Sequence, residues 1–425
     1  MPGGVALESA RFRGRSVQRG GGSGELRQGN LTQILRYLRD HGSSSRHDVA
    51  RGCGLGVSTM TDLVGDLRAR RLVVELDPIR RPGAGRPTRP IALDGSAWYV
   101  LGVHVEADHL ALIAATVGGD ELWRDQIDVD LEHEADGAAA VASLLERQLG
   151  RFPDANRLVA VEIGVPGPVT ADGVLSASRS LGWTDAPVGP AVRAALADAG
   201  LPGVRVGVST DAHLAGLELA RTALADPSTA VAVYLGGRRD VDSALVLDGE
   251  IFRGAAGGAG DLGHLHVADD GPGCWCGRPG CVNAFLRIEH LLVSSDLTSA
   301  DEAARMVAEQ PCKAVTVLSE AAASGEPKVL RALEEAGDAL GRAIDDLVGM
   351  VNPDAVLLGG YLGRLAPYLV PAVDRRLRVG GEVAPYAGTE LLALDHGQPQ
   401  VAAGAVLAAR DACLYDPLGL TRPLV

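Results

Sequence analysis

Residues 260–281 read GDLGHLHVADDGPGCWCGRPGC. This stretch places one histidine ahead of three clustered cysteines: His264, Cys274, Cys276 and Cys281. An imidazole and three thiols form a Cys3His set, which suits a tetrahedral zinc ion whose shell is filled by protein. Because a filled shell leaves no position for an activated water, we predict a structural Zn2+. Two alternatives stay open: His266 as the fourth ligand, or buried thiols without metal.

The three other cysteines, Cys53, Cys312 and Cys413, are scattered, which argues against a disulfide framework. No apolar run approaches the ~20 residues that a membrane span needs, and the first residues lack the apolar core of a signal peptide. We therefore expect a cytoplasmic protein without a membrane partner.

Charge is unevenly distributed along the 425 residues. Residues 1–94 carry 16 Arg, no Lys and 9 acidic residues, a net charge of +7, whereas the remainder carries −21. An Arg-rich tail supplies part of this excess, but residues 28–94 stay basic without it. A basic head on an acidic body is typical of a protein whose one end meets nucleic-acid phosphate.

Residues 28–94 contain the pattern of three short helices. Four apolar residues at i, i+3, i+4 and i+7 predict a first helix that ends near Gly42: Leu31, Ile34, Leu35 and Leu38. Ser45 is the expected N-cap of a second helix, and Ser58 that of a third. A Gly-containing turn at residues 52–56 joins these two, as in a helix-turn-helix unit.

Two short strands at residues 72–75 and 91–93 flank a basic Gly/Pro/Arg loop, which completes a wing. Three-helix units also serve as protein-interaction modules, but the basic wing favours double-stranded DNA. The expected DNA-binding residues are Arg46, Ser58, Thr59, Thr61 and Arg86. Of these, Arg86 is placed to enter a narrow minor groove.

From residue 99 onward, strands and helices alternate, which indicates an α/β architecture. Strands are expected at residues 99–106, 109–116, 158–165, 204–208, 230–235, 243–247 and 355–358, and helices at 138–149, within 299–350, and at 401–412.

Several motifs in this body occur together. GDLGH at 260–264 precedes Cys-x-Cys-Gly-x-x-Gly-Cys, and VPGPV at 165–169, SLGW at 180–183 and NPDAVLLGG at 352–360 accompany it. Together they resemble the signature of the ROK family (repressors, open reading frames and sugar kinases) over about residues 95–412. The winged helix ahead of them is similar to that of the family's repressor branch.

The resemblance implies an actin-like, ribonuclease-H-like, two-lobed sugar-kinase fold behind an N-terminal winged helix-turn-helix domain. It also implies zinc on His264 and the three cysteines, and a monosaccharide between the lobes. The expected domains are a flexible basic tail (1–27), a DNA-binding domain (28–94) and an effector-binding and dimerisation domain (95–425). The lobes of the last would cover about 95–207 plus the C-terminal helix, and about 208–395.

The phosphate-binding loops of ROK kinases are not conserved in this chain. The family's Asp-x-Gly-Gly-Thr is replaced at residues 103–108 by VHVEAD, and its Gly-Thr-Gly at 236–240 by GGRRD. Arg238 and Arg239 could bind an anion, but bulky side chains cannot replace the close backbone approach that glycines give to ATP phosphates. We therefore expect no kinase activity and no catalytic residues.

The sugar-binding side retains more of the family's residues. The expected effector-binding residues are Asp211, Asp261, His264 and Asn283. Asp211 matches the kinases' general base, Asp261 shortens a family glutamate by one methylene, and Asn283 replaces another glutamate. These changes would weaken or redirect recognition of sugar hydroxyls.

The sequence thus predicts a sugar-responsive bacterial transcription regulator, a repressor in its commonest form, acting as a homodimer or dimer of dimers on a pseudo-palindromic operator. The alternatives are a sugar kinase with an accessory DNA-binding head, and a DNA-binding scaffold that is blind to small molecules.

Overall fold

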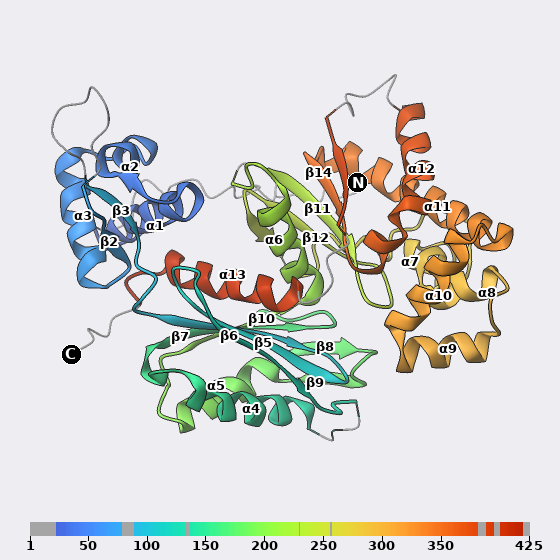
Figure 1. Cartoon of the computed structure of the whole chain (residues 1–425), viewed down its shortest axis with the longest axis horizontal. Coiled ribbons are helices and arrows are strands. Elements are labelled where there is room, and N and C mark those ends of the chain that lie inside the picture. The colour runs from blue at the N-terminus through green and yellow to red at the C-terminus, as the bar shows by residue number, and fades with distance from the viewer. Residues whose placement is uncertain are drawn as a thin grey trace, which may run out of the picture. The chain divides into compact units, whose positions relative to one another are not determined.

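The computed structural model describes residues 23–78, 89–132, 134, 136–228, 230–255, 257–380, 388–394 and 400–419. The chain divides into two units, which are shown in Figure 1. The smaller unit takes residues 1–94 and 414–425, and the larger takes 95–413. The chain's last residues therefore group with the head, whereas the sequence analysis assigned them to the body.

The smaller unit is a three-helix bundle with a three-stranded antiparallel sheet in the order β1-β3-β2. Its elements are α1 (Ser23–His41), β1 (Ser44–Ser45), α2 (Arg46–Gly52), α3 (Val57–Ala69), β2 (Val73–Glu75) and β3 (Pro90–Leu93). The predicted apolar face of the first helix is fully buried, since Leu31, Ile34 and Leu35 have no exposed surface. This face packs against α2 and α3 and forms the core of the unit.

Two boundary predictions for the smaller unit were wrong. Helix α1 begins at Ser23, inside the segment assigned to the tail. Helix α3 begins at Val57 with Gly56 as its N-cap, so Ser58 lies in its first turn instead of capping it. The predicted cap at Ser45 is confirmed, because its hydroxyl accepts a hydrogen bond from the backbone N–H of Asp48.

The C-terminal end of helix α13 (Gln400–Tyr415) belongs to the smaller unit and contacts α1. Side chains of Gln28 and Thr32 donate hydrogen bonds to the backbone carbonyl of Tyr415, at 3.2 and 3.1 Å. Arg39 donates to the Tyr415 hydroxyl at 3.0 Å, and the guanidinium of Arg36 lies over the Tyr415 ring. These donors satisfy one of the carbonyls that a helix leaves unpaired at its C-terminus.

The larger unit contains two five-stranded sheets of the same topology. In each, three antiparallel strands are followed by two strands that add in parallel on one side, in the orders β6-β5-β4-β7-β10 and β13-β12-β11-β14-β15. The strands of the first are β4 (Tyr99–Val105), β5 (His109–Thr116), β6 (Glu121–Asp128), β7 (Leu158–Val165) and β10 (Arg205–Thr210). Those of the second are β11 (Val231–Gly236), β12 (Asp242–Leu247), β13 (Glu250–Phe252), β14 (Ala355–Leu358) and β15 (Glu390–Ala393). The repeated topology confirms the predicted two-lobed fold.

The first sheet is covered on both faces, as Figure 1 shows. Helices α4 (Gly137–Gln148) and α5 (Val188–Asp198) bury Val141 and Val192 with one face. Helix α13 crosses the other face at Gly102, where a Cβ atom would lie 2.4 Å from the carbonyl oxygen of Ala402. Because β10 pairs with β7, this lobe extends to Thr210, three residues beyond the predicted boundary.

The second sheet is likewise buried on two sides. Helix α6 (Asp211–Ala223) packs against β11 and β12, and a helical layer that includes α11 and α12 packs on the opposite face. The helices of that layer are α7 (Val282–Leu286), α8 (Ile288–Ser294), α9 (Ala300–Glu309), α10 (Pro311–Ala323), α11 (Pro327–Val351) and α12 (Gly360–Gly380). A hairpin of β8 (Leu175–Ser178) and β9 (Trp183–Ala186) and the 3-10 turns Leu149–Arg151 and Ala155–Arg157 complete the unit.

Among the described residues, no helix combines the length and the hydropathy that a membrane crossing requires.

Candidate functional site

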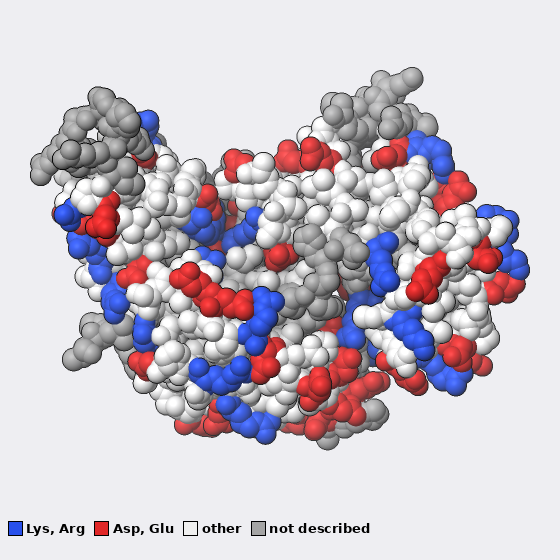
Figure 2. Space-filling model, viewed as in Figure 1, with Lys and Arg blue, Asp and Glu red and all other residues white. Residues whose placement is uncertain are grey.

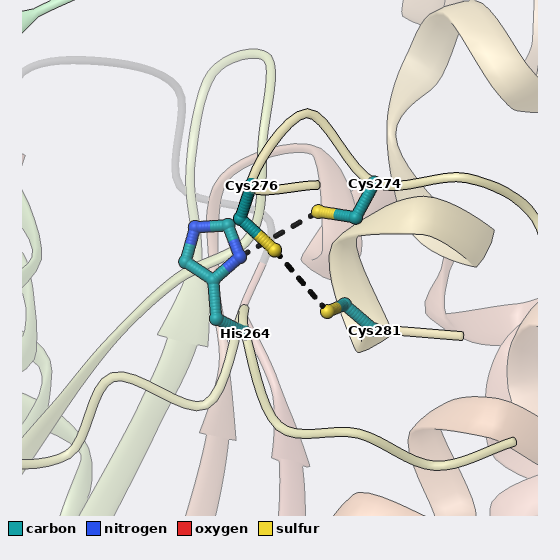
Figure 3. A group of neighbouring side chains, drawn as sticks. All are labelled: His264, Cys274, Cys276 and Cys281. Carbon is teal, nitrogen blue, oxygen red and sulfur yellow. Dashed lines mark hydrogen bonds between the residues drawn. The ribbon is translucent and has the colours of Figure 1, made fainter. Parts of the chain in front are cut away.

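The predicted metal ligands come together in the loop between β13 and α7 (Figure 3). Nδ1 of His264 lies 3.6 Å from Sγ of Cys274, and Sγ of Cys276 lies 3.6 Å from Sγ of Cys281. All four donor atoms lie within 4.8 Å of one another. A tetrahedral zinc ion with Zn–S bonds of about 2.3 Å separates its sulfurs by about 3.8 Å, so the donor set fits this ion.

Glycines give the loop its sharp turns. Gly277 and Gly280 have φ of +90° and +67°, a region that residues with a Cβ atom rarely adopt. At Gly280 a Cβ atom would also lie 1.6 Å from the carbonyl oxygen of Ala268. These two positions allow Cys276 and Cys281 to face the same point.

His266, the alternative fourth ligand, is turned away from the thiols. Its Nδ1 lies 3.0 Å from the carbonyl oxygen of Pro279, and its Nε2 lies 3.1 Å from Oδ1 of Asp269. Both ring nitrogens are thus engaged elsewhere, which leaves His264 as the imidazole of the cluster.

The local electrostatics favour a cation among the thiols. Hydrogen bonding by the backbone N–H of Arg278 lowers the pKa of Cys276 to about 6, whereas burial raises the pKa of Cys281 to about 12. A dication between the four donors would favour the thiolate form of both cysteines.

The loops that would hold ATP phosphates in a kinase are tied together by an ion-pair network. Arg238 contacts Glu106 at 2.8 Å and donates to both carboxylate oxygens of Asp108, at 3.3 and 3.2 Å. Burial would raise the pKa of Asp108, but the hydrogen bonds from Arg238 and His109 lower it to about 2. Arg238, considered above as an anion ligand, is instead paired with two carboxylates.

Two of the predicted effector-binding residues lie in a strongly acidic region. Asp211 is the first residue of α6, whose N-cap Thr210 accepts from the backbone N–H of His213. Asp242, which begins β12, has a pKa raised well above its usual range by burial and by the charges of Asp211, Asp240, Asp261 and Glu106. Asp211 and Asp261 therefore lie in one acidic group with a shared electrostatic field.

Asn283, another predicted effector-binding residue, is buried and hydrogen-bonded to backbone. Its side chain is 3% exposed, and its amide accepts from the backbone N–H of Val241 and donates to the Val241 carbonyl. The oxygen and the nitrogen of the amide are therefore both hydrogen-bonded to the backbone of Val241, the residue before β12. Its backbone N–H also donates to the carbonyl of Gly263, next to His264, at 2.9 Å.

The expected base-reading residues form an exposed first turn on α3. Ser58, Thr59 and Thr61 are all exposed, and Val57 beside them is 74% exposed. On the opposite side of the helix Met60, Leu63, Val64 and Leu67 are buried. In the view of Figure 2, basic side chains follow α3, whereas acidic side chains gather on the larger unit beside α4 and β9.

Ion pairs modify the expected charge of this surface. Arg46 pairs with Glu75 of β2, so this arginine is not a simple phosphate ligand. Asp66, an acidic residue on the same helix as Ser58 and Thr59, pairs with Arg27 and Arg70, each at 2.9 Å. Arg86 lies outside the described residues.

The family model described as the ROK family matches residues 100–412. The chain belongs to the ROK family. It is 28% identical over 399 residues to a transcriptional regulator of Mycobacterium tuberculosis, with 92% of this chain and 86% of the relative covered. A relative with an enzyme name, kanosamine kinase of Amycolatopsis mediterranei, is 30% identical over 266 residues, which cover 60% of this chain and 79% of the relative.

A solved ROK family transcriptional regulator, described as a homologue of the Escherichia coli Mlc protein, has a TM-score of 0.74 and 23% identity. It covers 93% of this chain and 98% of its own. At this identity the likeness shows a shared fold over nearly the whole chain.

The sequence did not predict one group of neighbouring side chains. His104, Glu106 and Asp211 converge from β4 and from the start of α6. The only signal was a histidine and a glutamate at the end of a buried strand, where kinases of the ROK family carry aspartate and glycines. Nothing in the sequence placed Asp211 opposite them.

Proposed function

We propose that this ROK family protein is a transcriptional regulator that binds operator DNA through its smaller unit and a sugar or sugar derivative through its larger unit. We further propose that it acts as a homodimeric repressor without kinase activity. The supporting observation is the extent of the likeness: regulators match 92–93% of the chain, including the head, whereas the kinase matches 60% of it.

The surface of α3 supports DNA binding. A helix N-terminus offers unpaired backbone N–H groups and a positive dipole end to phosphate. Hydroxyls at Ser58, Thr59 and Thr61 suit base edges or phosphates, and the exposed Val57 suits a thymine methyl. Since Asp66 is neutralised by two arginines, the remainder of the helix repels DNA less than its sequence suggested.

The chemistry of the phosphate loops supports the loss of kinase activity. Phosphoryl transfer depends on donors and metal ions positioned around the phosphates. Here Arg238 bridges Glu106 and Asp108, and Gly237 is folded so tightly that a Cβ atom would lie 2.0 Å from the carbonyl oxygen of Asp240. The negative carboxylates at this position would repel the negative charges of a triphosphate.

A structural zinc ion would brace the pocket wall. His264 would hold it together with Cys274, Cys276 and Cys281, and the ion supplies cross-linking of the loop rather than chemistry. Because His264 follows Asp261 by three residues, the same ion would fix the position of an effector-binding carboxylate.

The DNA-binding claim is tested by selecting bound sequences from random double-stranded DNA with the full chain. Affinity for the selected site, followed by fluorescence anisotropy, is expected to fall about tenfold or more in Thr59→Ala and in Arg86→Ala. Thr222→Ala, an exposed threonine on α6, is the matched control. Failure to enrich any sequence would contradict the proposal.

Two assays distinguish the proposed effector-binding regulator from the ligand-blind scaffold and from the sugar kinase. A thermal-shift screen of sugars and sugar phosphates is expected to find a stabilising compound, and a complete lack of stabilisation alongside intact operator binding would favour the ligand-blind scaffold. ATP turnover on the same panel is expected to be absent. Appreciable phosphorylation of any hexose would establish the kinase alternative.

A further inference from the structure

Three donor side chains meet at the end of strand β4, away from the cysteine cluster. Nε2 of His104 lies 3.3 Å from Oε1 of Glu106 and 3.4 Å from Oδ2 of Asp211. The three donor atoms all lie within 4.8 Å of one another. Among the described residues, this is the second group that brings metal-binding side chains together in this way.

The imidazole at the centre of this group is buried without a hydrogen-bond partner. His104 is 3% exposed, and neither Nδ1 nor Nε2 makes a hydrogen bond of acceptable geometry. Oδ1 of Asp211 is also buried and unpaired. Buried polar atoms without partners are uncommon in folded proteins and call for a bound species.

The surroundings of the group carry excess negative charge. The acidic residues that act on Asp242 include Glu106 and Asp211 themselves together with Asp240 and Asp261. Arg238 supplies one positive charge, but it contacts Oε2 of Glu106 and leaves Oε1 directed at His104. The field at the three donors therefore favours an added cation.

We propose that His104, Glu106 and Asp211 bind a divalent transition-metal ion of the Mn2+ or Zn2+ class. Metal–ligand bonds of about 2.1 Å separate neighbouring donors by about 3.0 Å in an octahedron and about 3.4 Å in a tetrahedron, and the two distances from Nε2 of His104 to the carboxylate oxygens, 3.3 and 3.4 Å, are close to these values. An imidazole with two carboxylates suits these ions better than Mg2+, which prefers an all-oxygen octahedron.

Three protein donors leave coordination positions for solvent or for a bound molecule. Asp211 is the only one of the three whose side chain is appreciably accessible, at 19%, so the open positions lie on its side. Arg238 acts as a positioning residue, because it fixes the carboxylate of Glu106 through its second oxygen.

The competing occupant is a proton. Burial alone would lower the pKa of His104, but Asp211 and Glu106 raise it above its usual value, so an imidazolium between two carboxylates could fill the same space. A proton and a metal ion cannot share Nε2. Metal binding therefore distinguishes them directly.

The test uses the full chain, stripped with a chelator and titrated with Mn2+, with free ion followed by electron paramagnetic resonance. Mn2+ is chosen because it has little preference for thiolates. We expect saturable binding of about one ion per chain with Kd below about 0.1 mM, weakened at least about tenfold in His104→Ala and in Asp211→Asn. The near-isosteric Asp211→Asn keeps the test valid if His104→Ala misfolds.

Two matched variants show that the site is the one described. His109→Gln changes a neighbouring imidazole outside the donor set, and Cys276→Ser removes the thiolate site; both are expected to bind Mn2+ like the wild type. Absence of saturable binding by the wild type would overturn the proposal. Binding that survives both His104→Ala and Asp211→Asn would overturn it as well. Neither outcome bears on DNA binding.

Discussion

Single residues determine where the charges of the larger unit lie. Arg238 stands where kinases of the family bind phosphate through glycine backbone, and it pairs with both Glu106 and Asp108. Asn283 gives up a carboxylate and bonds to the backbone of Val241. His264 contacts Cys274 through Nδ1. Of these three residues, Arg238 is the one that forms an ion-pair network where the family's kinases bind phosphate.

The cysteine cluster gives the first prediction at this scale. Cys276→Ser removes one of four ligands, so zinc content measured by elemental analysis is expected to fall from about one ion per chain to near zero. The apparent Tm of the larger unit should fall by at least about 4 °C, because metal binding stabilises only the folded state. Cys312→Ser, an exposed cysteine on α10, is the control. Equal zinc content in the two variants would contradict the ligand assignment.

Glu162 gives a second prediction, which concerns pH. This carboxyl lies buried between β7 and β10, where it accepts a hydrogen bond from Ser209, and burial raises its pKa despite the nearby Arg253. A raised folded-state pKa means that the unfolded chain loses the proton first as pH increases. Glu162 therefore lowers stability as pH rises from its unfolded pKa through its folded one.

Glu162→Gln keeps the shape and stays neutral. We expect this variant to gain stability over the wild type at pH 7 and to gain little at pH 4, as measured by urea unfolding at both pH values. The exposed Glu146→Gln should behave alike at the two pH values. A gain for Glu162→Gln that is equal at both would show that the charge of Glu162 is not the cause.

At the scale of elements, the sequence predicted those whose apolar pattern is local. Strand β14 was placed correctly because Ala355–Leu358 is a continuous apolar run between a proline and glycines. Helix α12 was missed because Pro367 and Pro371 argue against a helix, and its packing against α11 overrides that preference. The start of α3 was misplaced by one residue because serine is the commoner cap, whereas Gly56 takes that role here.

The candidate site was predictable only where its residues are close in sequence. The four residues of the cysteine cluster lie within 18 residues and carry their own glycine turns, so their spacing was enough to predict a metal site. His104 and Asp211 are brought together by strand β4 and the start of helix α6. The commitment of Asn283 to Val241 likewise depends on tertiary structure.

The end of α13 gives a prediction at the scale of elements. Tyr415→Phe removes the hydroxyl to which Arg39 donates and should weaken the smaller unit by about 1 kcal/mol, whereas Tyr415→Ala also removes the contact with Arg36 and should cost about 2 kcal/mol. Amide hydrogen exchange in α1 would then quicken about fivefold and about thirtyfold. Tyr368→Phe, in the larger unit, is the control. Unchanged exchange in α1 would show that Tyr415 does not stabilise the head.

At the scale of the whole molecule, the head and the remainder of the chain carry net charges of opposite sign. The head carries +7 and the remainder −21, so DNA is attracted to one part and repelled by the other. The logarithm of the affinity for DNA should therefore fall linearly with the logarithm of salt concentration. The selected operator should contain two related half-sites if two heads bind together.

The chain passes between the two units twice, at residues 94–95 and 413–414. The head therefore has two covalent connections to the larger unit.

The most direct test of a sugar-responsive regulator is the Kd for the selected operator, measured with and without the compound that stabilises the protein most in the thermal-shift screen. Coupled sites of this kind commonly change affinity by about 5- to 150-fold. We predict that the compound weakens operator binding by a factor within that range. In Asp211→Asn, the same concentration of the compound should no longer weaken operator binding. An operator Kd that is identical with and without a saturating, stabilising compound would contradict the account.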